Sequence, residues 1–148
     1  GTLVEAQLVS GGEIIEVPKN PKKEGFDFIY WYEKDINVSF DFGTQIFEDK
    51  TLYAKWEEKS DEDKIIEQLI KGLRGIVDRA NVSEELKADL HAYIDALEED
   101  IKRDDTLETK LAKIEHAREE ILRRIQEEID SIKIIKIGEA LKEFVTFF

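Results

Sequence analysis

FDFIYWY (residues 26–32) decides the fold of the first third of this chain. Its side chains follow the two-residue period of a β-strand, which places Phe26 and Phe28 on one face and Trp31 on the other. The later stretch TLYAKW (residues 51–56) has the same period, and it predicts a second strand with one packed face and one wet face.

We interpret the aromatic residues of these two stretches as the core of a small module. A domain of this size needs large side chains to bury enough apolar area. For the Trp and Tyr side chains, stacking on a sugar or on a proline-rich peptide is the alternative. The structural aromatic residues are Phe26, Phe28, Trp31, Tyr53 and Trp56.

Turn residues organise the segment that precedes these strands. The Ser-Gly-Gly sequence at residues 10–12 supplies the positive φ values of a tight turn, which predicts a hairpin between residues 3–9 and 13–17. Pro18 and Pro21 cannot donate to a sheet ladder, so they predict an extended connection along an edge.

A specific set of features occurs in a fixed order here: a Gly-Gly turn, a spaced Pro pair, a Gly-aromatic-x-aromatic step, a Trp-Tyr pair and a Thr-Leu-Tyr-Ala-Lys-Trp end. With them the chain, over roughly residues 2–57, resembles one unit of the Listeria–Bacteroides repeat, also called the internalin B-repeat. The resemblance implies a compact β-grasp-like sheet in a bacterial surface protein. The chain departs from the family at Tyr30, where Gly is usual, and at Leu8 and Val9, where a Phe-Asp pair is usual.

The character of the sequence changes near residues 57–60. Both Pro residues and most of the Gly precede this point, and a segment rich in Leu, Ile, Glu, Lys and Arg follows it. Such a change indicates a switch from strands and turns to helices. We therefore predict two domains, a β module at residues 1–57 and a helical bundle at residues 58–148.

Three amphipathic helices are predicted in the second domain. Residues 60–63 have the pattern of a capping box, and apolar residues then recur at steps of three and four as far as Ala80. Residues 81–84 end this helix and cap the next one. The second link, residues 103–106, is equally short. Short links between amphipathic helices predict an antiparallel bundle.

The third helix, predicted from about Asp105 to Ile137, is longer than its partners. At 1.5 Å per residue it extends about 50 Å, against about 30 Å for each of the first two. The overhang must pack on the β module, pack on a partner chain, or break near residues 134–138. Residues 139–148 then form a short final helix or an apolar tail.

The predicted fold class is therefore α+β, with a β-grasp-like module before a three-helix bundle that has a long third helix and a short C-terminal helix. Three phenylalanines near the end of the chain predict docking or self-association there. These candidate partner-surface residues are Phe144, Phe147 and Phe148.

Composition argues against several functional classes. The net charge of −13 opposes binding to nucleic acid or to an anionic membrane surface. There is no cysteine and no apolar run of the length that spans a bilayer. His116 has Glu119 and Glu120 within one turn, which could give two metal ligands. Two ligands without a third favour a solvated face. No phosphate loop, nucleophile elbow or catalytic triad is visible, so we expect no enzyme activity, cofactor or metal.

The sequence favours a non-enzymatic, extracellular segment of a bacterial cell-surface protein. In this hypothesis the β module is a spacer or adhesion unit and a helical face binds a protein, from the host or from the bacterial surface. One alternative is a helical oligomerisation or scaffold segment that self-associates through residues 134–148. Another is an accessory domain of a larger secreted enzyme.

Overall fold

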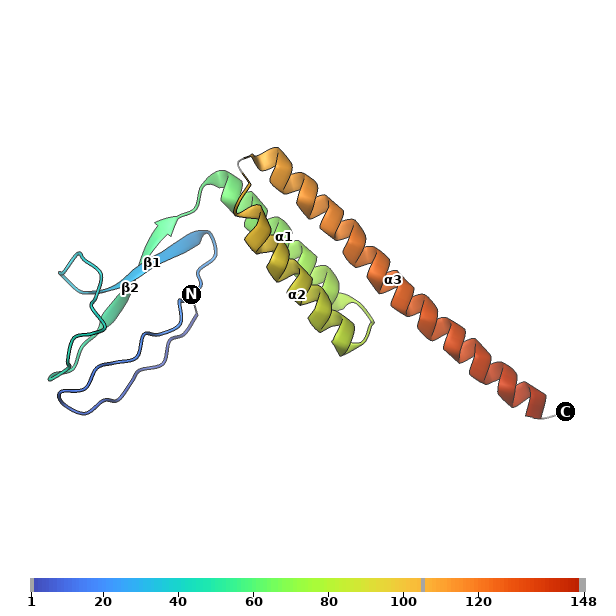
Figure 1. Ribbon diagram of the computed structural model, residues 1–148, viewed down its shortest axis with the longest axis horizontal. Helices are drawn as coiled ribbons and strands as arrows, with labels where there is room; N and C mark the ends of the chain where they lie inside the picture. The colour runs from blue at the N-terminus through green and yellow to red at the C-terminus, as the bar shows by residue number, and fades with distance from the viewer. Residues whose placement is uncertain (1, 105, 147–148) are drawn as a thin grey trace. The chain divides into compact units, whose positions relative to one another are not determined.

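The structure, a computed structural model, describes residues 2–104 and 106–146. In these ranges two β-strands are followed by three α-helices, which confirms the predicted α+β class (Figure 1). The chain divides into two compact units, Gly1–Lys64 and Ile65–Phe148. The first unit holds the strands, and the second holds the helices from Ile65 onward.

The first unit is organised by strands β1 (Phe26–Glu33) and β2 (Leu52–Glu58), which pair antiparallel. The register shifts by one residue between Phe28 and Tyr30. Ile29 is therefore the extra residue of a β-bulge, which bends the strand and reverses the alternation of the residues that follow.

The bulge changes which aromatic side chains meet. The ring of Trp31 lies 5.4 Å from that of Phe28, and Phe28 lies 5.9 Å from Trp56, between ring centroids. Tyr32 instead contacts Tyr53, with 5.9 Å between centroids. The prediction that Trp31 and Phe28 lie on opposite faces is wrong, because an extra residue in the ladder moves Trp31 to the face of Phe28.

The two arms predicted as a first hairpin, residues 3–9 and 13–17, are not β-strands. They are joined through a side chain, since the Gln7 amide donates to the carbonyl of Glu16 and accepts from its N–H, both at 2.9 Å. An antiparallel bridge ties the second arm to Ile46. Within the described residues the sheet has two strands, so the β-grasp comparison is not confirmed.

Helices α1 (Asp61–Arg79) and α2 (Glu84–Ile101) begin at serine caps, as the sequence predicts. The Ser60 hydroxyl accepts the N–H of Asp63 at 3.1 Å. Ser83 caps α2 in the same way and accepts the N–H three residues on at 3.2 Å. Each cap satisfies one of the amide groups that the first turn leaves without a helical partner.

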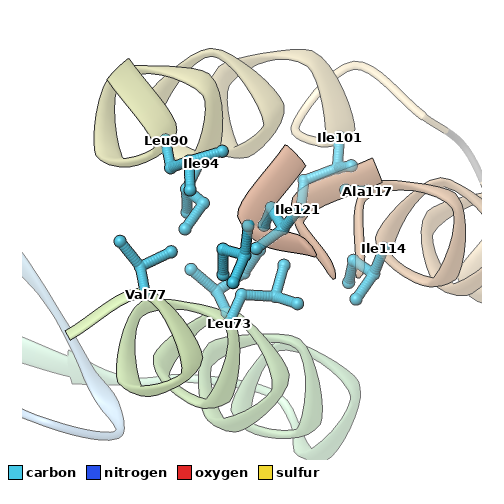
Figure 2. Packing of buried hydrophobic residues seen from close by; sticks show 10 residues of the cluster. Leu73, Val77, Leu90, Ile94, Ile101, Ile114, Ala117 and Ile121 are labelled. Carbon is cyan, nitrogen blue, oxygen red and sulfur yellow. The ribbon is translucent and has the colours of Figure 1, made fainter. Parts of the chain in front are cut away.

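The core of the second unit lies between the three helices (Figure 2). Among its side chains, Val77 of α1, Leu90 and Ile94 of α2, and Ile121 of α3 (Leu107–Thr146) are wholly buried. Burial of each such side chain stabilises the fold by about 1.5–3 kcal/mol. The buried cluster consists of Ile70, Leu73, Val77, Leu90, Ile94, Ile101, Ile114, Ala117, Ile121 and Ile125.

Helix α3 continues without a break to Thr146 and contains 40 residues, about 60 Å at 1.5 Å per residue (Figure 1). The predicted break near residues 134–138 and the separate short C-terminal helix are therefore wrong. A glycine inside a helix costs only about 1 kcal/mol relative to alanine. Gly138 is followed by good helix formers and no proline, so the helix passes through it.

Candidate partner surface

Helix α3 has two halves with different surroundings. In the proximal half, residues 107–129, Ile114 is 5% exposed and Ile121 is wholly buried. In the distal half, residues 130–146, Ile137 is 60% exposed and Leu141 is 59% exposed. The distal half therefore presents to solvent the side-chain types that its proximal half buries in the core.

The apolar side chains of the two halves also point in opposite directions. At about 100° per residue, Ile137 and Leu141 lie about 160° and 200° around the helix axis from Ile121. Glu139 lies five full turns beyond Ile121, in line with it. The face that packs in the proximal half thus carries both Ile135 and Glu139 in the distal half, whereas the solvated face becomes apolar.

On the outer face of α3, Arg123 belongs to a set of ion pairs in the proximal half. It donates to Glu120 at 2.7 Å and to Glu127 at 2.5 Å, and the hydrogen bond from Arg123 holds the pKa of Glu120 below its ordinary value. Leu141 lies five turns further along the same face. An ion-pair surface is replaced there by an exposed leucine.

The exposed apolar residues of the distal half form a heptad pattern. Their steps of three, four and three residues are those of a and d positions in a coiled coil. We call this set the distal seam, and it consists of Ile134, Ile137, Leu141 and Phe144. Each of the four is 59–70% exposed.

Phe144, a predicted partner-surface residue, belongs to the distal seam and is 63% exposed. The other two predicted residues, Phe147 and Phe148, lie outside the described residues. The seam residues Ile134, Ile137 and Leu141 are missing from that predicted set. Comparing their angular positions with that of Ile121 would have identified them from the sequence.

Charged side chains on the bundle are engaged within the unit. Arg74 of α1 donates to Asp95 of α2 at 2.7 Å and also contacts Glu98. Lys113 of α3 donates to Asp100 of α2 at 2.7 Å, and this hydrogen bond lowers the pKa of Asp100. These interactions connect the helices to one another, so the distal seam is the stronger candidate for contact with a partner.

The aromatic residues of the first unit pack mainly on one another. Phe26, Phe28, Trp31 and Trp56 are half-buried, whereas Tyr53 is 42% exposed. A hollow of about 570 Å³ lies against Trp31. The Trp31 Nε1 is buried and has no hydrogen-bond partner among the described residues. The residues that line the hollow include Leu8, Ile15, Trp31, Ile46, Phe47 and Leu52.

No group of three or more His, Cys, Asp or Glu side chains within residues 2–104 and 106–146 is arranged to hold a metal ion. Over the same part of the chain, no helix combines the length and the apolar character needed to cross a membrane.

Comparison with known proteins identifies the first unit. Residues 1–55 match the model of the Listeria-Bacteroides repeat domain, and the helical remainder matches no family model. A protein of Evansella cellulosilytica named "Putative membrane protein" is 44% identical over 56 residues, which cover 36% of this chain and 8% of that relative. The chain thus spans less than a tenth of the relative it matches. No solved structure matches this chain.

Proposed function

We propose, from the premise that residues 1–55 form a Listeria-Bacteroides repeat, that the chain is a non-enzymatic, extracellular segment of a bacterial cell-surface protein. Repeats of this family are found in bacterial surface proteins. In this proposal the repeat is a spacer or adhesion unit, and the helical unit supplies a protein-binding face.

The observation that carries the binding role is the exposed distal seam. Soluble domains rarely leave contiguous apolar side chains in water unless these contact a partner. Ile134 is 70% exposed and Phe144 is 63% exposed, and both lie on one helix face. This face supports binding of a helical or apolar protein surface.

The spacer role is supported by the first unit. Its rings contact one another at centroid distances of 5.0–6.4 Å. Tilted and edge-on ring pairs of this kind add stability to a small domain that buries little aliphatic area. Aromatic packing is therefore the better-supported role of these side chains, and stacking on a ligand is the weaker one.

The cellular part of the proposal is tested on the organism that makes the protein. Antibodies against residues 1–64 are applied to intact cells and to lysed cells, with a cytosolic enzyme as the control for lysis. We expect labelling of intact cells that a brief protease treatment removes. Labelling only after lysis contradicts the cell-surface location.

The binding role is tested with beads that carry the full chain, applied to host cells and to bacterial cells. The matched variants are Ile137→Glu in the distal seam and Ile135→Glu on the other side of the same helix. The proposal predicts that beads with the unchanged chain or with Ile135→Glu capture cells, and that beads with Ile137→Glu do not. Equal capture by all three excludes the distal seam as the binding face.

A further inference from the structure

We propose that the distal seam is the contact between two copies of this chain, which associate antiparallel through the distal halves of α3. The inference rests on the proposed function only in that the seam binds protein, and it identifies the partner. Cell-surface location is tested independently, so either statement can fail while the other stands.

The distal seam lies beyond the reach of the bundle. Its residues face away from the side of α3 that packs on α1 and α2, so the bundle of the same unit cannot cover them by extending further. In line with the bundle face, the distal half carries Ile135 together with Glu139 and Glu143, so this face is mixed and does not repeat the apolar line of the seam. A helix that covers the seam must therefore lie on the outer face of α3.

The seam is complementary to itself when two copies pair antiparallel. In an antiparallel pair, a positions of one helix face d positions of the other. Ile134 then faces Phe144 of the second copy, and Ile137 faces Leu141. Each layer combines one β-branched isoleucine with one residue that is not β-branched, and the same two layers repeat on both sides of the centre. Such a contact is isologous, as in most homodimers.

Small residues flank the centre of the seam. Gly138 and Ala140 occupy the positions beside the a and d residues, where long side chains would hold two helices apart. A Cβ added at Gly138 would meet no atom within 4 Å. Two backbones can therefore approach closely at this point.

The distribution of charge also favours contact between copies at the distal half. The whole chain has a net charge of −13, so two copies repel each other over most of their surface. The distal half, residues 130–146, contains three Lys, two Glu and one Asp, which gives a net charge of zero (3 − 3). Contact between copies therefore costs least in this segment.

The same repulsion selects the antiparallel arrangement. Ile129 is the last residue of α3 that packs against the core, and about 15 Å of helix separates it from the centre of the seam. Antiparallel association thus places the two acidic bundles about 30 Å apart along the helix axis. That is several times the Debye length of about 8 Å at physiological salt. A parallel pair would place the bundles side by side.

The seam is short, so a reversible dimer is expected. Two heptads on each helix correspond to the lower end of specific interfaces, below about 1,200 Å² of total buried surface. The mass of the full chain, followed by sedimentation equilibrium across a hundredfold concentration range, should rise from 17.2 kDa toward twice that value. A constant mass of 17.2 kDa across the range overturns the proposal.

Matched variants separate the seam from general hydrophobicity. Ile137→Glu places a charge in the seam and should weaken association at least about tenfold. Ile135 is 61% exposed, close to the 60% of Ile137, but lies about 160° away around the helix. Ile135→Glu should therefore leave association within about twofold. Equal weakening by both variants overturns the proposal, provided that thermal unfolding of the bundle is unchanged in each.

Disulfide trapping tests the orientation, because the chain has no cysteine of its own. Ile134→Cys and Phe144→Cys copies are mixed and oxidised. The antiparallel layer brings these two positions within disulfide reach, whereas two copies of position 134 lie about 15 Å apart along the axis. The mixed disulfide should dominate. Symmetrical disulfides formed by Ile134→Cys alone overturn the antiparallel arrangement.

Discussion

Ile121 and Leu141 belong to the same unbroken helix, but one is wholly buried and the other is 59% exposed. The difference does not come from hydrophobicity, since both are large aliphatic residues. It comes from position, because Leu141 lies beyond Ile129, the last residue of α3 that packs on the core, and about 200° around the helix from Ile121. One helix can thus serve two packing partners, the bundle on one face and a second chain on the other.

The largest contrast between the halves should come from matched truncations. Ile121→Ala removes a wholly buried side chain and should lower the free energy of unfolding by about 2–5 kcal/mol. Leu141→Ala should change it by less than about 0.5 kcal/mol at concentrations where the chain is monomeric. Urea unfolding of the second unit measures both. Comparable losses from the two variants would mean that the distal half packs within its own chain.

A smaller effect is expected at the cap of α2. Ser83→Ala removes the hydroxyl that accepts the N–H of Leu86, so we expect a loss of about 1 kcal/mol in the free energy of unfolding. The control is Ser131→Ala in the distal half, where alanine favours the helix and the change should stay within about 0.5 kcal/mol. An unchanged midpoint for Ser83→Ala in urea unfolding contradicts the capping role.

Gly138→Ala should act on the distal half alone. Alanine favours a helix interior by about 1 kcal/mol over glycine, and a Cβ at this position has open space around it. In the monomer we expect slower amide hydrogen exchange near residue 138, with no change in the unfolding midpoint of the bundle. Faster exchange in this variant would argue that the helix is interrupted there.

The smallest expected effect is the response of the proximal half to acid. Hydrogen bonds from Ser83 to Glu128 hold the pKa of this carboxyl below its ordinary value of 4.5. Its lower folded-state pKa contributes stability above pH about 4.5, and this is lost as the pH falls through the folded-state pKa. The urea midpoint of the bundle should therefore fall on acidification.

Two variants test whether Glu128 contributes to this dependence of the urea midpoint on pH. Glu128→Gln should reduce the dependence of the midpoint on pH, whereas Glu139→Gln, in the distal half, should leave it as in the unchanged chain. Because these carboxyl groups are exposed, salt should weaken the effect. An identical pH dependence in both variants removes Glu128 from the explanation.

Much of the helical unit is predictable from the sequence. Serine caps identify the starts of α1 and α2, and apolar spacing identifies the core, because both are local properties of the chain. Leu90, Ile94 and Ile121 all have apolar neighbours three or four residues away, as in an amphipathic helix, and all are wholly buried. Leu69, also on a predicted line, is 40% exposed, since periodicity alone does not determine how wide the packed stripe is.

Three features depend on more than local pattern. The bulge at Ile29 brings Trp31 to the same face of β1 as Phe28, an arrangement that a two-residue period does not contain. The first hairpin has β-prone arms but is joined by the side chain of Gln7. Helix α3 continues through Gly138 because the helix propensity of the neighbouring residues offsets the cost of glycine, about 1 kcal/mol relative to alanine. Of the distal seam, Phe144 was predicted from the sequence. The other three residues are found only when their angular positions on the helix are compared with that of Ile121.

Hydrogen exchange along α3 tests the central claim most directly, measured residue by residue at low and high protein concentration. The account predicts slow exchange in residues 107–129 at both concentrations, because the core protects them. It predicts faster exchange in residues 130–146 at low concentration, and protection at high concentration that Ile137→Glu abolishes and Ile135→Glu preserves. Exchange of residues 130–146 at unfolded-chain rates at every concentration would contradict both the continuous helix and its second packing face.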